Sequence, residues 1–81
     1  MSVHELKVWP SIFRQIVGGN KTAEIRKCDR DFSIGDTLAL RPFDPDTKTF
    51  ERAHPVFAEI THIQYGFGLQ EGYAMLSFKL R

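Results

Sequence analysis

The stretch GGNKTAEIR, residues 18–26, decides how the rest of the chain is organised. Its two glycines and its asparagine tolerate positive φ, so they predict the end of a preceding helix. The residues that follow alternate as in a strand, which places Ala23 and Ile25 on one face. The opposite face carries Thr22, Glu24 and Arg26, with Lys21 at the turn beside them. We expect the apolar pair to face a core and the polar row to face away from it.

The polar row brings a hydroxyl, a carboxylate and a guanidinium within reach of one small polar ligand, because same-face neighbours lie roughly 7 Å apart. Lys21 and Glu24 are candidate acid and base, since burial can make a lysine and a carboxylate a proton-transfer pair. Arg26 offers a planar fork for a carbonyl, carboxylate or phosphate group. The competing interpretation is structural: Glu24 and Arg26 pair with each other, or with cross-strand charges, on a solvated face.

The spacing Gly19-x-Lys21-x-x-Glu24-x-Arg26 resembles the G-x-K-x-x-E-x-R signature of ASCH domains, which belong to the PUA-like superfamily. Further pieces resemble, in the same order, a compact ASCH-like family of phage and bacterial proteins. They are His4-Glu5-Leu6-Lys7, Trp9-Pro10, Asp29-Arg30-Asp31-Phe32, Gly35-Asp36 and Gly66-Phe67-Gly68-Leu69. The resemblance covers nearly the whole chain and implies a small β-barrel that recognises RNA or a nucleotide-like ligand.

Length and composition predict one domain over residues 1–81, since 81 residues are too few for two cores. No apolar run is long enough to span a membrane, so we expect a cytoplasmic protein without a membrane partner. The net charge of +1 gives little support to strong nonspecific nucleic-acid binding. Residues 1–30 nevertheless hold six Lys and Arg against three Asp and Glu, a balance of +3 that favours an anionic ligand near residues 18–26.

The hydrophobic pattern predicts an α+β fold that is mainly β, a small PUA-like barrel of five or six strands with one α-helix closing one end. The expected strands are residues 3–8, 22–26, 37–43, a return strand from Phe50 interrupted near Pro55, 56–63 and 73–80, and the helix starts at Trp9-Pro10. The expected core residues are Ala23, Ile25, Leu38, Leu40, Leu76 and Phe78, with Ile12, Phe13 and Ile16 of the helix docked on them.

Other residues have two interpretations each. His4 is either a half-buried, hydrogen-bonded histidine or part of a site lining. Lys7 and Arg30 either contact phosphates or are ordinary exposed cations. Tyr65 and Phe67 lie in a glycine-rich loop, where they either stack on a base or cap the end of the barrel.

Metal and thiol chemistry find no support in the sequence. The three histidines, His4, His54 and His62, and the lone Cys28 do not have the spacing of metal ligands, so we predict no metal site and no cofactor. A single cysteine excludes an intrachain disulfide and favours a reducing compartment. We interpret Cys28 as inert rather than as a nucleophile.

The resulting hypothesis is an RNA- or nucleotide-binding domain whose cleft is floored by residues 21–26 and rimmed by residues 65–69. The first alternative is a small hydrolase, an amidohydrolase or nuclease acting on a modified nucleoside or RNA, with Lys21 and Glu24 as acid and base. Some ASCH-like proteins that resemble this chain hydrolyse acylated cytidine nucleosides, with a threonine at the position of Glu24. The second alternative is a protein-interaction module, such as a phage-encoded inhibitor of a host factor. The sequence predicts no oligomeric state.

Overall fold

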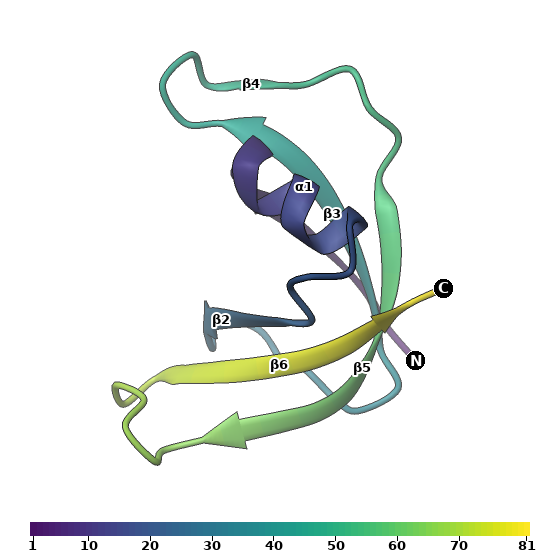
Figure 1. The fold of residues 1–81 in the computed structure, drawn as a ribbon. Coiled ribbons are helices and arrows are strands. Elements are labelled where there is room, and N and C mark those ends of the chain that lie inside the picture. Colours follow the sequence, from purple (N-terminus) through teal and green to yellow (C-terminus); the bar gives the residue numbers. More distant parts are fainter.

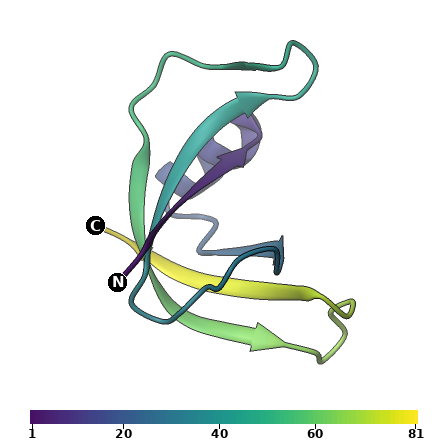
Figure 2. The same ribbon diagram turned by 180° about the vertical axis from the view of Figure 1, so that it is seen from behind.

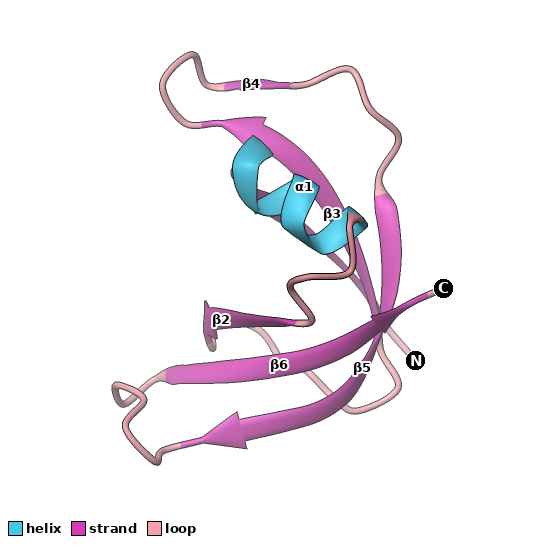
Figure 3. Ribbon diagram, in the orientation of Figure 1, coloured by secondary structure: helices cyan, strands magenta, loops and turns pink.

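A curved sheet of six strands forms most of the structure, a computed structural model that describes residues 1–81 (Figure 1). The elements are β1 (Val3–Val8), α1 (Pro10–Val17), β2 (Ala23–Lys27), β3 (Thr37–Asp44), β4 (Thr49–Phe50), β5 (Val56–Tyr65) and β6 (Tyr73–Leu80). The strand order is β1-β3-β5-β6-β2, with β4 paired to β3. Strands β1 and β3 run parallel, and the other pairs are antiparallel. The expected mainly β fold with one helix is therefore confirmed (Figure 3).

The sheet is open, because its edge strands β1 and β2 are not paired with each other. Figure 2 shows the sheet bending, with β1 and β3 in one arm and β6 in the other, while β5 runs through both. The bend follows an irregularity in the β5–β6 register between Ile60 and His62, where Thr61 is an extra residue. A bulge of this kind bends a strand and changes the phase of its side chains. Accordingly Ala58 and Ile60 are buried before it, and Ile63 packs against the core after it.

The helix α1 lies against the inner side of the bent sheet, over β3 (Figure 1). Pro10 occupies its first turn, where a missing amide hydrogen costs nothing. The helix ends at the two glycines as expected, with Gly19 at φ +82°. Ile16 is fully buried, and Ile12 and Phe13 pack on the core, which confirms the predicted docking of the helix. No helix of the structure has the length and apolar character that crossing a membrane requires.

The core gathers side chains from both arms of the sheet and from the helix. Its buried members are Leu6, Val8, Ile16, Leu38, Leu40, Ala58, Ile60, Ala74, Leu76 and Phe78. The predicted core positions in β3 and β6 are therefore correct. The return strand is shorter than expected: β4 has two residues, and residues 51–55 are irregular up to Pro55, which has no amide hydrogen to donate to a ladder.

The orientation of β2 is the reverse of the predicted one: its charged residues Glu24 and Arg26 face the core side of the sheet, and its apolar residues face away. Ile25 is 55% exposed and belongs, like Ala23, to no part of the core. Glu24 lies directly across from Leu76, and Arg26 directly across from Ala74. Since directly opposed residues share a face and both β6 residues are fully buried, the charged row points to the core side of the sheet. The antiparallel register with β6, which the alternation of β2 alone does not reveal, decides this orientation.

Candidate functional site

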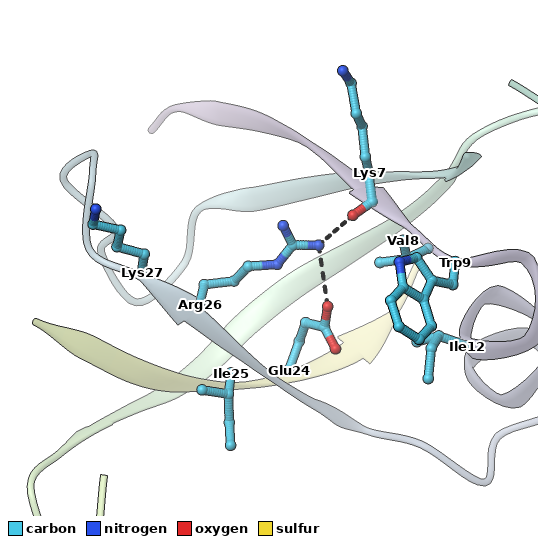
Figure 4. A pocket seen from close by; sticks show the side chains of 8 residues that line it. All are labelled: Lys7, Val8, Trp9, Ile12, Glu24, Ile25, Arg26 and Lys27. Carbon is cyan, nitrogen blue, oxygen red and sulfur yellow. Dashed lines mark hydrogen bonds and ion pairs between the residues drawn. The ribbon is translucent and has the colours of Figure 1, made fainter. Parts of the chain in front are cut away.

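A cleft of about 350 Å³ lies between the two unpaired edges of the sheet (Figure 4). One side comes from the end of β1 and the start of α1, and the other side comes from β2. Its lining residues are Lys7, Val8, Trp9, Ile12, Glu24, Ile25, Arg26 and Lys27. The cleft therefore exists because the sheet is bent and open. Glu24 and Arg26, two residues of the stretch 18–26, line it.

Glu24 is the centre of the polar groups in this cleft. Its carboxylate lies 3.3 Å from the Lys21 ammonium through Oε1 and 3.1 Å from Arg26 Nη2 through Oε2. The Glu24 side chain is only 14% exposed, against 31% for Lys21 and 25% for Arg26. The structure thus brings the three predicted residues together as an ion-paired row. Glu24 and Arg26 do pair with each other, but they do so on the concave side of the sheet rather than on a solvated face.

Arg26 also spans the gap between the two edge strands. Its Nη2 donates to the backbone carbonyl of Lys7, 2.5 Å away, in addition to contacting Glu24. Its Nε atom is buried and has no hydrogen-bond partner. A buried donor without an acceptor is costly, by about 1–3 kcal/mol, and calls for an explanation. The guanidinium is therefore held in place at the cleft while keeping a donor that the protein does not satisfy.

Lys7 lines the cleft through its backbone and not through its charge. Its ammonium lies over the ring of Phe43, 4.6 Å from the centroid, and 5.7 Å from that of Phe50. Figure 4 shows this amino group pointing away from Arg26. Arg30, the other predicted phosphate contact, donates to the carbonyl of Glu5 at 3.2 Å. Both cations are thus engaged within the protein.

His4 has a structural role at the other end of β1. Its Nε2 is 2.8 Å from Asp36, which also accepts hydrogen bonds from the amides of Ser2 and Ser33. The His4 ring packs edge-on against Phe32, with the centroids 4.8 Å apart. Of the two interpretations open for His4, the hydrogen-bonded one is confirmed, and His4 does not line the cleft. The partner carboxylate was missed, although the Gly35-Asp36 turn was visible in the sequence.

Tyr65 and Phe67 lie at a second depression of about 470 Å³, at the turn between β5 and β6. Tyr65 lines it together with Cys28, Leu69, Gly66 and Gly72, whereas Phe67 is 95% exposed beside it. The two aromatics are therefore not satellite core. They also do not form a rim of the first cleft, so the single cleft expected from the sequence is two separate depressions. Thr22 is exposed and lines neither of them.

Trp9 is the residue of the cleft that the sequence reasoning missed. It was noted as the start of the helix and as part of the family resemblance, but not as a site residue, yet it is 62% exposed and lines the cleft opposite β2. The available signal was composition: Trp9 is the single tryptophan of the chain, directly before a helix-starting proline. No group of three or more His, Cys, Asp or Glu side chains is arranged to hold a metal ion.

The fold and the cleft define a small, mainly β domain with a charged row on the concave side of its sheet. A family model described as a domain of unknown function (DUF3850) matches residues 3–78, and the chain belongs to this family. The chain is also similar to an "Uncharacterized 12.9 kDa protein in GpA 3'region" of Escherichia phage P2. The two are 31% identical over 61 residues, which are 75% of this chain and 56% of the phage protein. The chain thus spans about half the length of this relative.

Proposed function

We propose that the protein is an RNA- or nucleotide-binding domain of the ASCH type that holds its ligand in the cleft between β1 and β2. The observation that carries this proposal is the inward-facing row of Lys21, Glu24 and Arg26 on the concave side of the sheet. Charged side chains rarely turn toward a core unless they are paired or serve a ligand. Here they are paired, and Glu24 and Arg26 also border a cleft.

The PUA-like barrel architecture belongs to the same proposal. Two arginines, Arg26 of β2 and Arg30 of the loop after it, reach the open edge of β1: Arg26 donates to the carbonyl of Lys7, and Arg30 to that of Glu5. Side-chain donors thus satisfy carbonyls that a paired strand would satisfy in a fully closed barrel. The bend in β5 brings the edges close enough for these contacts, which supports a barrel whose seam is occupied by side chains and by the cleft.

The polar groups of the cleft favour a ligand that offers both donors and acceptors. Glu24 retains acceptor capacity, because a carboxylate has about four lone-pair sites and two cations contact it here. Arg26 has guanidinium donors beyond the Nη2 that contacts Glu24 and the Lys7 carbonyl. A plain anion would use only the cations, whose charge Glu24 partly neutralises. The edge of a nucleobase offers donors and acceptors side by side, and so matches this pattern better.

One observation favours the hydrolase as a second candidate. The Lys21 ammonium and the Glu24 carboxylate are in contact at 3.3 Å, as an acid and a base of an amidohydrolase or nuclease would be. The substitution Lys21→Arg distinguishes the binding function from the hydrolase function. Arginine keeps the positive charge, so a binding site retains part of its affinity, but a guanidinium stays protonated and cannot replace a lysine that transfers a proton.

The deciding experiment follows binding and turnover together. Wild type, Lys21→Arg and Glu24→Gln are incubated with nucleotides, short single-stranded RNAs and acylated cytidines, with the exposed-site variants Lys79→Arg and Glu51→Gln as matched controls. We expect wild type to bind, Lys21→Arg to bind more weakly, Glu24→Gln to lose most binding, and none to turn substrate over. Wild-type hydrolysis that both cleft variants lose while binding persists would establish the hydrolase. Absence of any binding would overturn the proposal in favour of a protein-interaction module.

A further inference from the structure

We propose that the indole of Trp9 is the surface on which a nucleobase stacks in this cleft, and that Lys27 receives the phosphate of the same nucleotide. The inference rests on the proposed function and makes it specific. It assigns a base end and a phosphate end to the cleft, and it gives a role to two residues that contribute nothing to the core.

The first argument is that the Trp9 ring is not used for folding. Its neighbour Val8 is 3% exposed and Ile16 of the same helix is 1% exposed, whereas Trp9 is 62% exposed. An aromatic ring of this size usually buries a large area in a core or at an interface. Trp9 instead stands at the mouth of the cleft, beside the partly buried Ile12.

The second argument is that the backbone holds Trp9 in position. Its φ of −61° and ψ of 148° are extended, and its carbonyl accepts the first hydrogen bond of the helix, 2.8 Å from the amide of Phe13. Pro10 follows directly and fixes the entry into α1. The indole therefore has only its two side-chain torsions to order, so little entropy is lost when a flat ligand covers it.

The third argument is what lies across the cleft. Figure 4 shows the indole on the side of β1 and α1 and the Glu24 carboxylate on the side of β2. A base stacked on Trp9 would present its edge toward Glu24 and Arg26, an acceptor and a donor. The cleft volume of about 350 Å³ is at the lower end of ligand pockets, about 300–1,000 Å³, which suits one nucleotide rather than a helix.

The fourth argument concerns charge along the cleft. Arg26 is engaged by Glu24 and by the Lys7 carbonyl, and the Lys7 ammonium points away. Lys27 belongs to the same outward row of β2 as Ile25, but it lines the end of the cleft, is exposed and forms no ion pair with any carboxylate of the chain. Figure 4 places it at the end of the cleft away from Trp9. The free cation is therefore separated from the stacking surface, as the phosphate of a nucleotide is from its base.

The test uses the fact that Trp9 is the only tryptophan, so its fluorescence reports on the cleft alone. AMP, GMP, CMP, UMP and ribose 5-phosphate are titrated into wild type, with calorimetry as a second measurement of Kd. We expect the nucleotides to quench Trp9 and ribose 5-phosphate to leave it unchanged. Trp9→Ala should weaken nucleotide binding about 5- to 150-fold, while Trp9→Phe retains most of it. Phe57→Ala, an exposed aromatic on β5, is the matched control and should bind as wild type does.

The phosphate end is tested by comparing AMP with adenosine. Lys27→Ala should reduce the preference for AMP several-fold, and Lys79→Ala should not. Nucleotide binding by calorimetry without quenching, and with Trp9→Ala unaffected, would overturn the stacking role and leave the proposed function standing. Failure of all nucleotides and short RNAs to bind would overturn both. Circular dichroism of each variant ensures that lost binding is not lost folding.

Discussion

Asp36 connects the start of β1 to the turn that leads into β3. It is 4% exposed and accepts hydrogen bonds from His4 Nε2 at 2.8 Å and from the backbone amides of Ser2 and Ser33 at 3.2 and 3.0 Å. These hydrogen bonds, the one from His4 first, outweigh burial and hold the pKa of Asp36 below its ordinary value of 3.8. A carboxylate with a lowered folded-state pKa stabilises the fold while it is ionised.

We therefore expect Asp36→Asn to be less stable than wild type at neutral pH and to lose less stability on acidification. The contribution of Asp36 is fully present above its unfolded-state pKa, near 3.8, and is lost as the pH falls from there through the lower pKa of the folded state. Urea unfolding between pH 2 and 7 measures both effects. Asp31→Asn, at an exposed position, is the control. Wild-type and Asp36→Asn curves that run parallel below pH 4 would contradict the assignment.

The residues of the site were predicted better than their orientation. Lys21, Glu24 and Arg26 form one ion-paired row, as their spacing indicated. A period of two assigns residues to rows but does not say which row faces the core, because the register with a partner strand decides that. Trp9 was missed for a related reason: whether an aromatic beside a proline is core or surface depends on how the strand and the helix meet.

The orientation of β2 makes a prediction that compares two apolar residues of paired strands. Phe78→Ala removes a side chain that is 4% exposed and should lower the free energy of unfolding by about 3–5 kcal/mol. Ile25→Ala removes one that is 55% exposed and should cost about 1 kcal/mol or less, mostly through strand propensity. Chemical denaturation of both variants at one pH measures the two losses in free energy of unfolding. Comparable losses in the two variants would mean that Ile25 faces the core after all.

At the scale of elements, regular strands were predictable and irregular ones were not. The strands Val3–Val8 and Tyr73–Leu80 have the predicted bounds, since their alternating apolar residues are uninterrupted. The bulge at Thr61 could not be predicted from the sequence. A single inserted residue only shifts the alternation of buried and exposed side chains, which is weak in a half-exposed strand. That bulge bends the sheet, so neither the open edge nor the cleft beside it followed from the hydrophobic pattern.

The two arginines that donate to carbonyls of β1, Arg26 from β2 and Arg30 from the loop after it, should differ in their contribution to stability. Arg26→Ala removes contacts to the Lys7 carbonyl and to the poorly exposed Glu24, and should cost about 1–3 kcal/mol. Arg30 is more exposed, and Arg30→Ala should cost about 1 kcal/mol or less. Urea unfolding measures both, with Arg52→Ala in the irregular segment as the control. Equal, small losses would show that Arg26 does not hold the two edges together.

For the molecule as a whole, charge limits the kind of nucleic acid that the proposed binding site would accept. The net charge is +1, and the basic excess of residues 1–30 is largely engaged within the protein. Arg26 and Lys21 contact Glu24, Arg30 contacts Glu5 and Asp29, and Lys7 lies over aromatic rings. An extended phosphate backbone would therefore meet few free cations. One or two nucleotides carry few phosphates, so the few free cations would suffice for them.

The proposed function thus predicts a weak salt dependence of RNA binding. Each phosphate neutralised on a single strand adds about 0.7 to the slope of log K against log salt concentration. With Arg26 and Lys27 lining the cleft and Lys21 in contact with Glu24 beside it, the slope should be at most about 2 in magnitude. Fluorescence anisotropy of a labelled short single-stranded RNA, titrated at several KCl concentrations, measures it, and Lys27→Ala should lower it further while Lys79→Ala does not. Tight binding of long duplexes with a steep slope would require a basic surface outside the cleft, and would place the nucleic acid elsewhere on the molecule.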